Sequence, residues 1–220
     1  RCPHGDLPEA SADLIAQLAR SGRSAALIVP ELAPHRSAAP PGALAQPGGL
    51  ARLLDEVLAR SQGPQAAWRA ADLQRVVLIC HSGSYRVAAA LLARGDVPGV
   101  PIHEVYLLDA VYGEVPALAA FVEAAPSAFA PSVAEGGQRL VVLHGEGTEE
   151  GSRALWQRAQ AALAGVVPEG RLRHSDRESA PDAADLAAAV LVHRVPAGHS
   201  AIPATYTADL LASSGLPVIR

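Results

Sequence analysis

The chain has 220 residues, half of them hydrophobic, which is enough to bury a full core as one domain. Its net charge of −4 is small and its arginines are scattered, so we expect no nucleic-acid partner. The longest apolar runs have strand length and fall short of the roughly 20 residues that span a bilayer. We therefore also expect no membrane span.

Lysine, asparagine and methionine are absent, whereas alanine, arginine and glycine are abundant, a bias typical of a GC-rich bacterial genome. The missing initiator methionine indicates a processed chain or a fragment of a longer protein. We expect a soluble bacterial protein, and the sequence leaves open whether it is cytoplasmic or secreted. The two cysteines, Cys2 and Cys80, do not decide it.

Helices and strands are predicted to alternate along the chain. In chain order, the apolar patterns and turn residues predict a helix at 10–20, a strand at 25–29, a helix at 50–59, a strand at 76–79, a helix at 85–93, a strand at 104–108, a helix at 116–123, a strand at 140–143, a helix at 153–163, a short helix at 182–188, a strand at 190–195 and a helix at 202–213. This alternation favours an α/β fold, a three-layer α/β/α sandwich with a mostly parallel sheet. We expect a single domain over residues 1–220.

Three stretches are predicted to be irregular. Residues 33–49 are rich in proline, glycine, alanine and serine, and their length makes them a candidate loop or lid over the carboxyl edge of the sheet. Residues 125–138 and 170–185 are interpreted as further loops. In open parallel sheets, ligands bind at the carboxyl ends of the strands. The residues of interest at such ends are His4, Ser82, Asp109, Glu146 and His199.

The most informative stretch is a strand, a tight turn and a helix at 76–90. Four apolar residues are followed by Cys-His-Ser-Gly-Ser, in which small residues surround Ser82, and then by an alanine-rich helix. A serine at such a turn lies beside the first free N–H groups of the helix, where negative charge is favoured. Two interpretations follow, a nucleophile and a simple helix N-cap.

The turn resembles the nucleophile elbow of the α/β-hydrolase superfamily, Gly-x-Ser-x-Gly, with Cys80 and Ser84 in place of the two outer glycines. Three short pieces carry this resemblance: His-Ser-Gly-Ser-Tyr-Arg, Leu-Leu-Asp-Ala-Val-Tyr-Gly and Gly-His-Ser-Ala-Ile-Pro, at 81–86, 107–113 and 198–203. They are similar to a poorly characterised bacterial branch of serine hydrolases. The resemblance implies an α/β-hydrolase-like fold and a serine, acid and histidine triad.

His199 follows the last predicted strand, where the superfamily keeps its catalytic base, and His144 is the rival candidate. His193 falls within a strand and is interpreted as structural. Two residues compete for the acid of the triad. Asp109 is favoured because it directly follows an apolar strand, whereas Glu146 has the position more usual in the superfamily but lies between two glycines.

The backbone N–H of Gly83 is the first candidate for the oxyanion hole. His4-Gly5 resembles the superfamily's His-Gly motif, which implies a second donor from the backbone of Gly5 or Asp6. The strand that should precede this motif is reduced to residues 1–3, so we expect an N-terminally shortened sheet. A shortened sheet exposes an edge strand, which favours a homodimer.

Other classes of site have little support. The chain contains no Cys-x-x-Cys or His-Glu-x-x-His motif and no dinucleotide fingerprint, and Gly-Glu-Gly-Thr at 145–148 lacks the lysine of a phosphate-binding loop. We expect neither metal nor cofactor. The sequence thus predicts a serine hydrolase that cleaves a small-molecule ester, or less readily an amide, through an acyl-enzyme on Ser82. The alternative is a non-catalytic binding module with the same fold.

Overall fold

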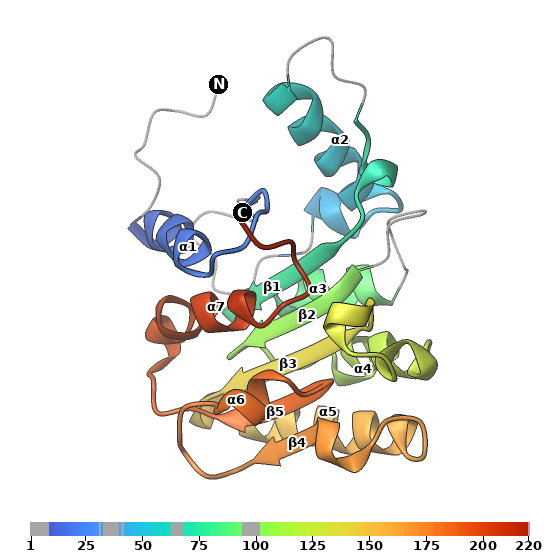
Figure 1. Cartoon of the computed structure of the whole chain (residues 1–220), viewed down its shortest axis with the longest axis vertical. Coiled ribbons are helices and arrows are strands. Elements are labelled where there is room, and N and C mark those ends of the chain that lie inside the picture. Colours follow the sequence, from blue (N-terminus) through green and yellow to red (C-terminus); the bar gives the residue numbers. More distant parts are fainter. Residues whose placement is uncertain are drawn as a thin grey trace.

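A computed structural model describes residues 9–30, 32, 40, 42–62, 68–93 and 102–219 of the chain. Its central feature is a five-stranded sheet in the order β1-β2-β3-β5-β4, in which every neighbouring pair is parallel (Figure 1). The strands are β1 (Val76–His81), β2 (Ile102–Leu108), β3 (Arg139–His144), β4 (Leu172–Ser175) and β5 (Val190–Arg194). The predicted α/β class with a parallel sheet is confirmed.

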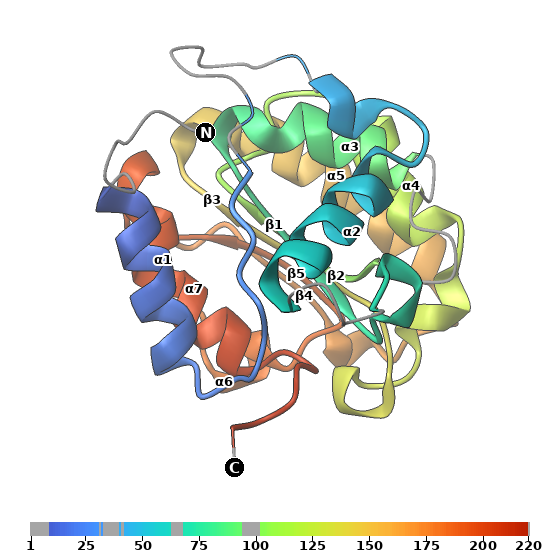
Figure 2. The same cartoon turned by 90° about the horizontal axis from the view of Figure 1, so that it is seen from above.

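Helices cover both faces of this sheet. They are α1 (Glu9–Arg20), α2 (Gly49–Gln62), α3 (Tyr85–Leu92), α4 (Val115–Glu123), α5 (Glu149–Leu163), α6 (Ala183–Leu186) and α7 (Ile202–Ala212). Figure 2 shows α3, α4 and α5 on one side of the strands and α6 and α7 on the other. No helix in the described ranges is long and apolar enough to cross a membrane.

Side-chain alternation along the strands produces two apolar layers. In β2, Val105 and Leu107 pack into the layer under α2, α3, α4 and α5, whereas Tyr106 and Leu108 pack into the layer under α7. All four side chains are fully buried. Continuous apolar runs are typical of strands covered on both faces, which explains why β2, β3 and β5 were predicted from the sequence. The other predicted strand, β1, is a half-buried edge strand that also has an apolar run.

Two predictions about strands are wrong. Residues 25–29 do not form a strand: the chain there is irregular and half exposed at Leu27 and Val29, and just before it Arg23 makes only an isolated antiparallel bridge with Val218. A short apolar run alone does not provide a neighbouring strand to pair with. Conversely, β4 lies within the predicted loop 170–185. Its Leu-Arg-His-Ser sequence has no apolar run because it is a half-exposed edge strand.

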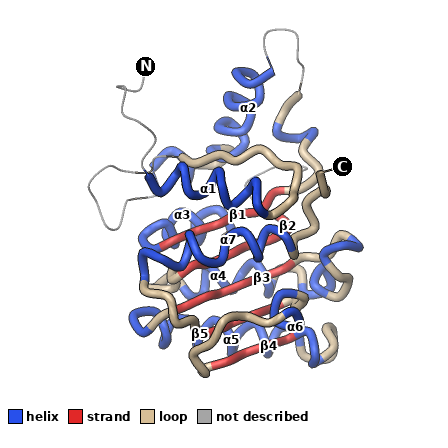
Figure 3. Tube along the Cα trace, turned by 60° about the vertical axis from the view of Figure 1, so that its left-hand side comes forward, coloured by secondary structure: helices blue, strands red, loops and turns tan. Residues whose placement is uncertain are grey.

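Helix α1 packs on α7 rather than on the sheet (Figure 3). The buried side chain of Gln17 joins the two helices, because its amide donates to the carbonyl of Ala204 and its carbonyl accepts from the N–H of Ala208 at 2.9 Å. The end of the chain is tied to the segment after α1, where the N–H of Ser24 donates to the carbonyl of Pro217 at 2.8 Å. Hydrogen bonds therefore join α1 to α7 and the end of the chain to the segment after α1.

A fully buried carboxylate, Glu104 in β2, connects the sheet to the segment that follows α7. It accepts hydrogen bonds from the hydroxyl of Tyr106 at 2.7 Å and from the N–H of Gly215 at 2.9 Å. Arg75 lies 3.3 Å and Arg139 3.9 Å from its oxygens. Arg139 is itself fully buried, so Glu104 is the counter-charge that makes its burial tolerable.

Replacing Glu104 by alanine should lower the free energy of unfolding by about 3–5 kcal/mol, because the Arg139 guanidinium is left buried without its countercharge. Denaturant unfolding of the purified variant measures this loss. The matched control is Glu56→Ala in α2, which breaks an exposed i,i+4 pair with Arg60 and should cost less than about 1 kcal/mol. Equal effects of the two substitutions would contradict the structural importance of Glu104.

Candidate active site

The structure brings together three polar side chains from the carboxyl ends of three strands. Ser82 directly follows β1, Asp109 directly follows β2, and His199 lies in the turn after β5. The Nε2 atom of His199 is 3.0 Å from Ser82 Oγ, and its Nδ1 atom is 2.6 Å from Asp109 Oδ2. These are the three residues predicted from the sequence as nucleophile, base and favoured acid.

The backbone at Ser82 has a conformation that non-glycine residues seldom adopt. Its φ is +54°, in the left-handed region, and a single 3-10 turn (Ser82–Ser84) then leads directly into α3. Such strain at a strand-to-helix turn holds a hydroxyl out of the sheet edge, as a nucleophile requires. Cys80 and Ser84, two residues before and after Ser82, fit because both are small, and the hydroxyl of Ser84 donates to the carbonyl of His81 at 2.7 Å.

Cys80 itself is not a reactive group. Its side chain is almost fully buried at the end of β1, and its thiol is free. Burial raises the pKa of the Cys80 thiol to about 12, so the nucleophilic thiolate is not available near neutral pH. The residue acts as a small apolar side chain under the turn, so its thiol does not compete with the hydroxyl of Ser82.

The hydrogen bonds define the protonation of the His199 ring. The carboxylate of Asp109 can only accept, so Nδ1 carries the proton and Nε2 presents its lone pair to the hydroxyl of Ser82. In this tautomer the imidazole can take the serine proton. The side chain of His199 is 40 % exposed whereas that of Asp109 is 5 % exposed, so the base faces solvent and the acid lies beneath it.

Asp109 is held more firmly than the sequence alone suggested. Its φ is +45°, and its N–H donates to the carbonyl of Leu143 at 2.7 Å. Its second oxygen, Oδ1, accepts from the N–H of Gly145 at 3.0 Å and from the hydroxyl of Thr148. Burial raises the pKa of Asp109, but these bonds and the one to His199 outweigh burial and hold the pKa below its usual value.

The Gly-Glu-Gly-Thr loop thus has a role that the sequence analysis missed. It was excluded as a phosphate-binding loop, and the structure shows that Gly145 and Thr148 hold the carboxylate of Asp109 instead. The available signal was its position, since the loop follows β3, the strand beside β2. No residue pattern distinguishes such a supporting threonine from an ordinary loop residue.

Tyr112 was also not predicted. Its hydroxyl lies 3.3 Å from His199 Nδ1, and its ring meets the imidazole edge to face at 6.2 Å between centroids. The side chain is 49 % exposed, although the two residues before it are buried. Burial and the charge of Asp109 raise the pKa of the Tyr112 phenol, so it is neutral at physiological pH. It covers one edge of the His199 ring.

The rival candidates lie elsewhere. Glu146 has a side chain that is 88 % exposed and pairs with Arg194 at 3.2 Å. His144 is buried at the end of β3, and its Nδ1 donates to the carbonyl of Gly145 at 3.1 Å. Burial lowers the pKa of His144. Neither residue belongs to the bonded group around Ser82.

Several predicted residues lie outside the described part of the chain. These are His4, Gly5 and Asp6 of the second oxyanion donor, Cys2, and residues 33–39 and 41 of the predicted lid. Of that lid, 42–45 form a 3-10 helix, η1 (Gly42–Ala45), which packs beside α2 and α3. Gly83 is described, and as a residue of the first helical turn its N–H has no partner within the turn.

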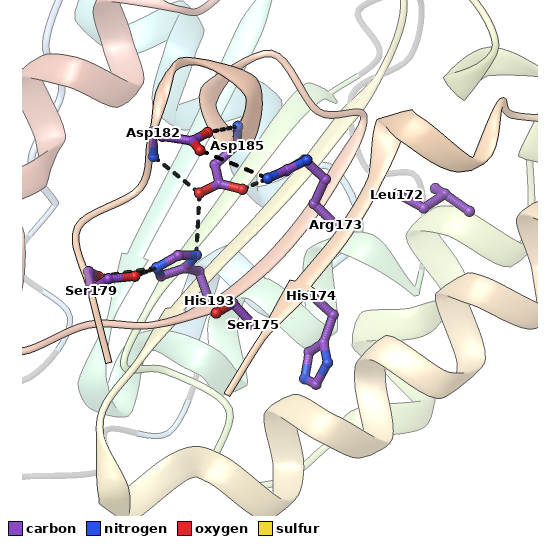
Figure 4. Close-up of a pocket in the computed structure, with 8 residues that line it drawn as sticks. All are labelled: Leu172, Arg173, His174, Ser175, Ser179, Asp182, Asp185 and His193. Atoms are coloured by element: carbon purple, nitrogen blue, oxygen red, sulfur yellow. Dashed lines mark hydrogen bonds and ion pairs between the residues drawn. The ribbon is translucent and has the colours of Figure 1, made fainter. Parts of the chain in front are cut away.

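A second serine, histidine and aspartate group lines a polar cavity of about 390 Å³ beside β4 (Figure 4). His193 Nε2 is 3.0 Å from both Oγ and the carbonyl oxygen of Ser179, and its Nδ1 is 3.5 Å from Asp185. A carbonyl can only accept, so Nε2 carries the proton and is not free to take one from Ser179. Asp185 is also bonded to Arg173.

This second group therefore connects structural elements, and its histidine is not placed to take a proton from a serine as His199 is. Arg173 belongs to β4, Asp185 to α6 and His193 to β5, so their bonds fix the edge strand and the short helix to the sheet. The structural interpretation of His193 made from the sequence agrees with these contacts. Ser179 lies within the irregular segment between β4 and α6, and not at the first position after a strand as Ser82 does.

Within the described ranges, no three histidine, cysteine, aspartate or glutamate side chains are arranged to hold a metal ion. No family model matches this chain, and neither a curated protein nor a solved structure shows significant similarity to it. The class that the structure establishes is an α/β protein with a parallel sheet. Any functional assignment must come from the geometry of the site itself.

Proposed function

We propose that the chain is an α/β-hydrolase-like serine hydrolase that cleaves a small-molecule ester, or less readily an amide. The observation that carries the proposal is the hydrogen-bonded sequence Ser82, His199 and Asp109, with separations of 3.0 Å and 2.6 Å. These residues lie 27 to 117 positions apart in the chain, yet they meet in the order and protonation state that acyl transfer needs.

The proposed reaction has two halves. In the first, Ser82 Oγ attacks the ester carbonyl carbon while His199 Nε2 takes the hydroxyl proton, and the same proton then passes to the departing alcohol as its bond to the carbonyl carbon breaks. In the second, His199 takes a proton from water, the resulting hydroxide attacks the acyl group, and the acid leaves as Ser82 regains its proton. Asp109 stabilises the imidazolium formed in each half.

The oxyanion that develops in both halves requires hydrogen-bond donors. The N–H of Gly83 meets this need because it directly follows the nucleophile at the beginning of a helical turn. The proposed second donor, the backbone of Gly5 or Asp6, comes from the resemblance to the superfamily. We propose no metal and no cofactor, since each proton transfer has a residue to carry it out.

A binding module with the same fold is the alternative. The replacement of the outer glycines of the elbow by Cys80 and Ser84 favours it. The geometry supports the hydrolase instead, because a vestigial site has no need to keep Ser82 and Asp109 in left-handed backbone conformations.

A fluorophosphonate probe, which reacts only with activated serines, tests the proposal. We expect stoichiometric labelling of the purified protein, with the adduct located on Ser82 by mass spectrometry of the modified peptide. His199→Gln should slow the labelling by at least about 100-fold, because the hydroxyl then lacks its base. His193→Gln is the matched control and should label at the wild-type rate. Folded protein that does not label would favour the binding module.

A further inference from the structure

His81, the residue directly before the nucleophile, contacts the catalytic base although the mechanism above does not use it. Its Nε2 atom lies 3.0 Å from the backbone carbonyl oxygen of His199. Its ring also packs against the ring of His199, with 4.5 Å between centroids and 33° between the planes. One side chain therefore contacts both the backbone and the imidazole of the base.

The contact determines the protonation of His81. A carbonyl oxygen can only accept, so the bond requires a proton on Nε2 of His81. Burial lowers the pKa of His81, and the positive charge that His199 acquires lowers it further, although the bond to the carbonyl acts in the opposite direction. The ring is therefore neutral near physiological pH, protonated at Nε2 and unprotonated at Nδ1.

We propose that His81 is a positioning residue that fixes the distance between the base and the nucleophile. This inference rests on the proposed hydrolase function. His81 is the last residue of β1 and Ser82 directly follows it. The bond from His81 therefore ties His199 to the same strand end that carries Ser82, its partner in the proton transfer. Without this bond, the position of His199 depends on its own turn and on its contacts with Asp109 and Tyr112.

The turn that carries His199 explains why such a bond is needed. His199 begins a 3-10 turn, η8 (His199–Ala201), and follows Pro196, Ala197 and Gly198, which are irregular. The turn is closed from one side by the carbonyl of Gly198, which accepts from the N–H of Ala201 at 2.8 Å. His81 adds a side-chain bond from β1, which is part of the sheet. Proton transfer is sensitive to such placement, because a shift of about 1 Å can lower a rate by about 100-fold.

The first test examines the bond without reference to activity. Long-range ¹H–¹⁵N NMR of protein labelled at histidine reports which ring nitrogen carries the proton, and His81→Gln identifies the signals of His81. We expect the Nε2-protonated form of His81 at pH 7.5. The Nδ1-protonated form would rule out the bond to His199 and overturn the inference.

The second test separates positioning from general packing. His81→Leu removes the N–H donor and should lower kcat for a p-nitrophenyl ester by about 100-fold, with KM changed less than about threefold. His81→Gln places an amide N–H near the position of Nε2 and should restore kcat to within about tenfold of wild type. His174→Leu, a half-buried histidine in β4, is the control and should keep the wild-type kcat.

The outcomes distinguish this inference from the function on which it rests. Wild-type protein that labels and hydrolyses esters, together with a leucine variant of unchanged kcat, would overturn the role of His81 alone. Equal losses in the glutamine and leucine variants would overturn the role of the donor. Wild-type protein that neither labels nor hydrolyses any ester would overturn the proposed function and this inference with it. Circular dichroism shows that each variant is folded.

Discussion

Replacing Ser82 by alanine is expected to lower kcat for ester hydrolysis by about 10³- to 10⁶-fold while the protein stays folded. The reason is that the substitution removes the only oxygen that His199 Nε2 contacts at 3.0 Å in the described site, and with it the acyl-enzyme route. Steady-state kinetics with a p-nitrophenyl ester, on protein repurified to remove contaminating esterases, measures the loss.

Two substitutions control this result. Ser84→Ala changes a serine in the same turn whose hydroxyl donates to the carbonyl of His81 at 2.7 Å, and it should change kcat by less than about tenfold. Ser82→Gly should be as inactive as the alanine variant but more stable by about 1 kcal/mol, because glycine adopts a φ of +54° without strain. An alanine variant that keeps wild-type kcat would rule out Ser82 as the nucleophile.

The stability gain expected for Ser82→Gly shows what the sequence could not predict about this turn. Small residues around a serine predicted the position of the turn, since a strand packed closely on a helix needs small side chains. They did not predict the left-handed backbone, because serine does not favour it and the glycines that would indicate it are replaced by Cys80 and Ser84. The strained residue lies where β1 ends and the turn into α3 begins.

The same distinction applies to the fold. Strands β2 and β3 were predictable because burial on both faces demands a continuous apolar run. Strand β4 was not, because an edge strand that faces a polar cavity has no such run, and its residues Arg173 and Ser175 are those of a typical loop. Residues 25–29 show the converse error: they are apolar, but no strand in the described part of the chain lies beside them to pair with.

Within the site, the residues at strand ends were predictable and their supports were not. Position after an apolar strand predicted Ser82 and Asp109, because the carboxyl ends of parallel strands share one edge of the sheet. The supporting residues contact Asp109 or His199 from segments distant in the sequence, and no local pattern encodes such contacts. They are Thr148, Tyr112 and His81. They became visible only when the three strand ends were placed side by side.

Replacing Asp109 by asparagine is expected to lower kcat by about 10⁴-fold. An asparagine amide that donates to Nδ1 of His199 forces the proton onto Nε2, which then cannot accept the proton of Ser82. The substitution also removes the charge that stabilises the imidazolium. Because the pKa of Asp109 is held below its usual value, the wild-type carboxylate is ionised throughout the neutral range, so the loss in the variant should be present across the whole range from pH 6.5 to pH 8.5.

Glu146→Gln is the matched variant for the competing acid. It should change kcat by less than about twofold, because the exposed side chain of Glu146 pairs with Arg194 and not with His199. A large loss in this variant together with a small loss in Asp109→Asn would transfer the role of the acid to Glu146. That result would require the loop at 145–148 to move toward His199, and it would have to release Asp109 from Gly145 and Thr148 to do so. The four bonds that hold Asp109 in place are the reason to expect the opposite result.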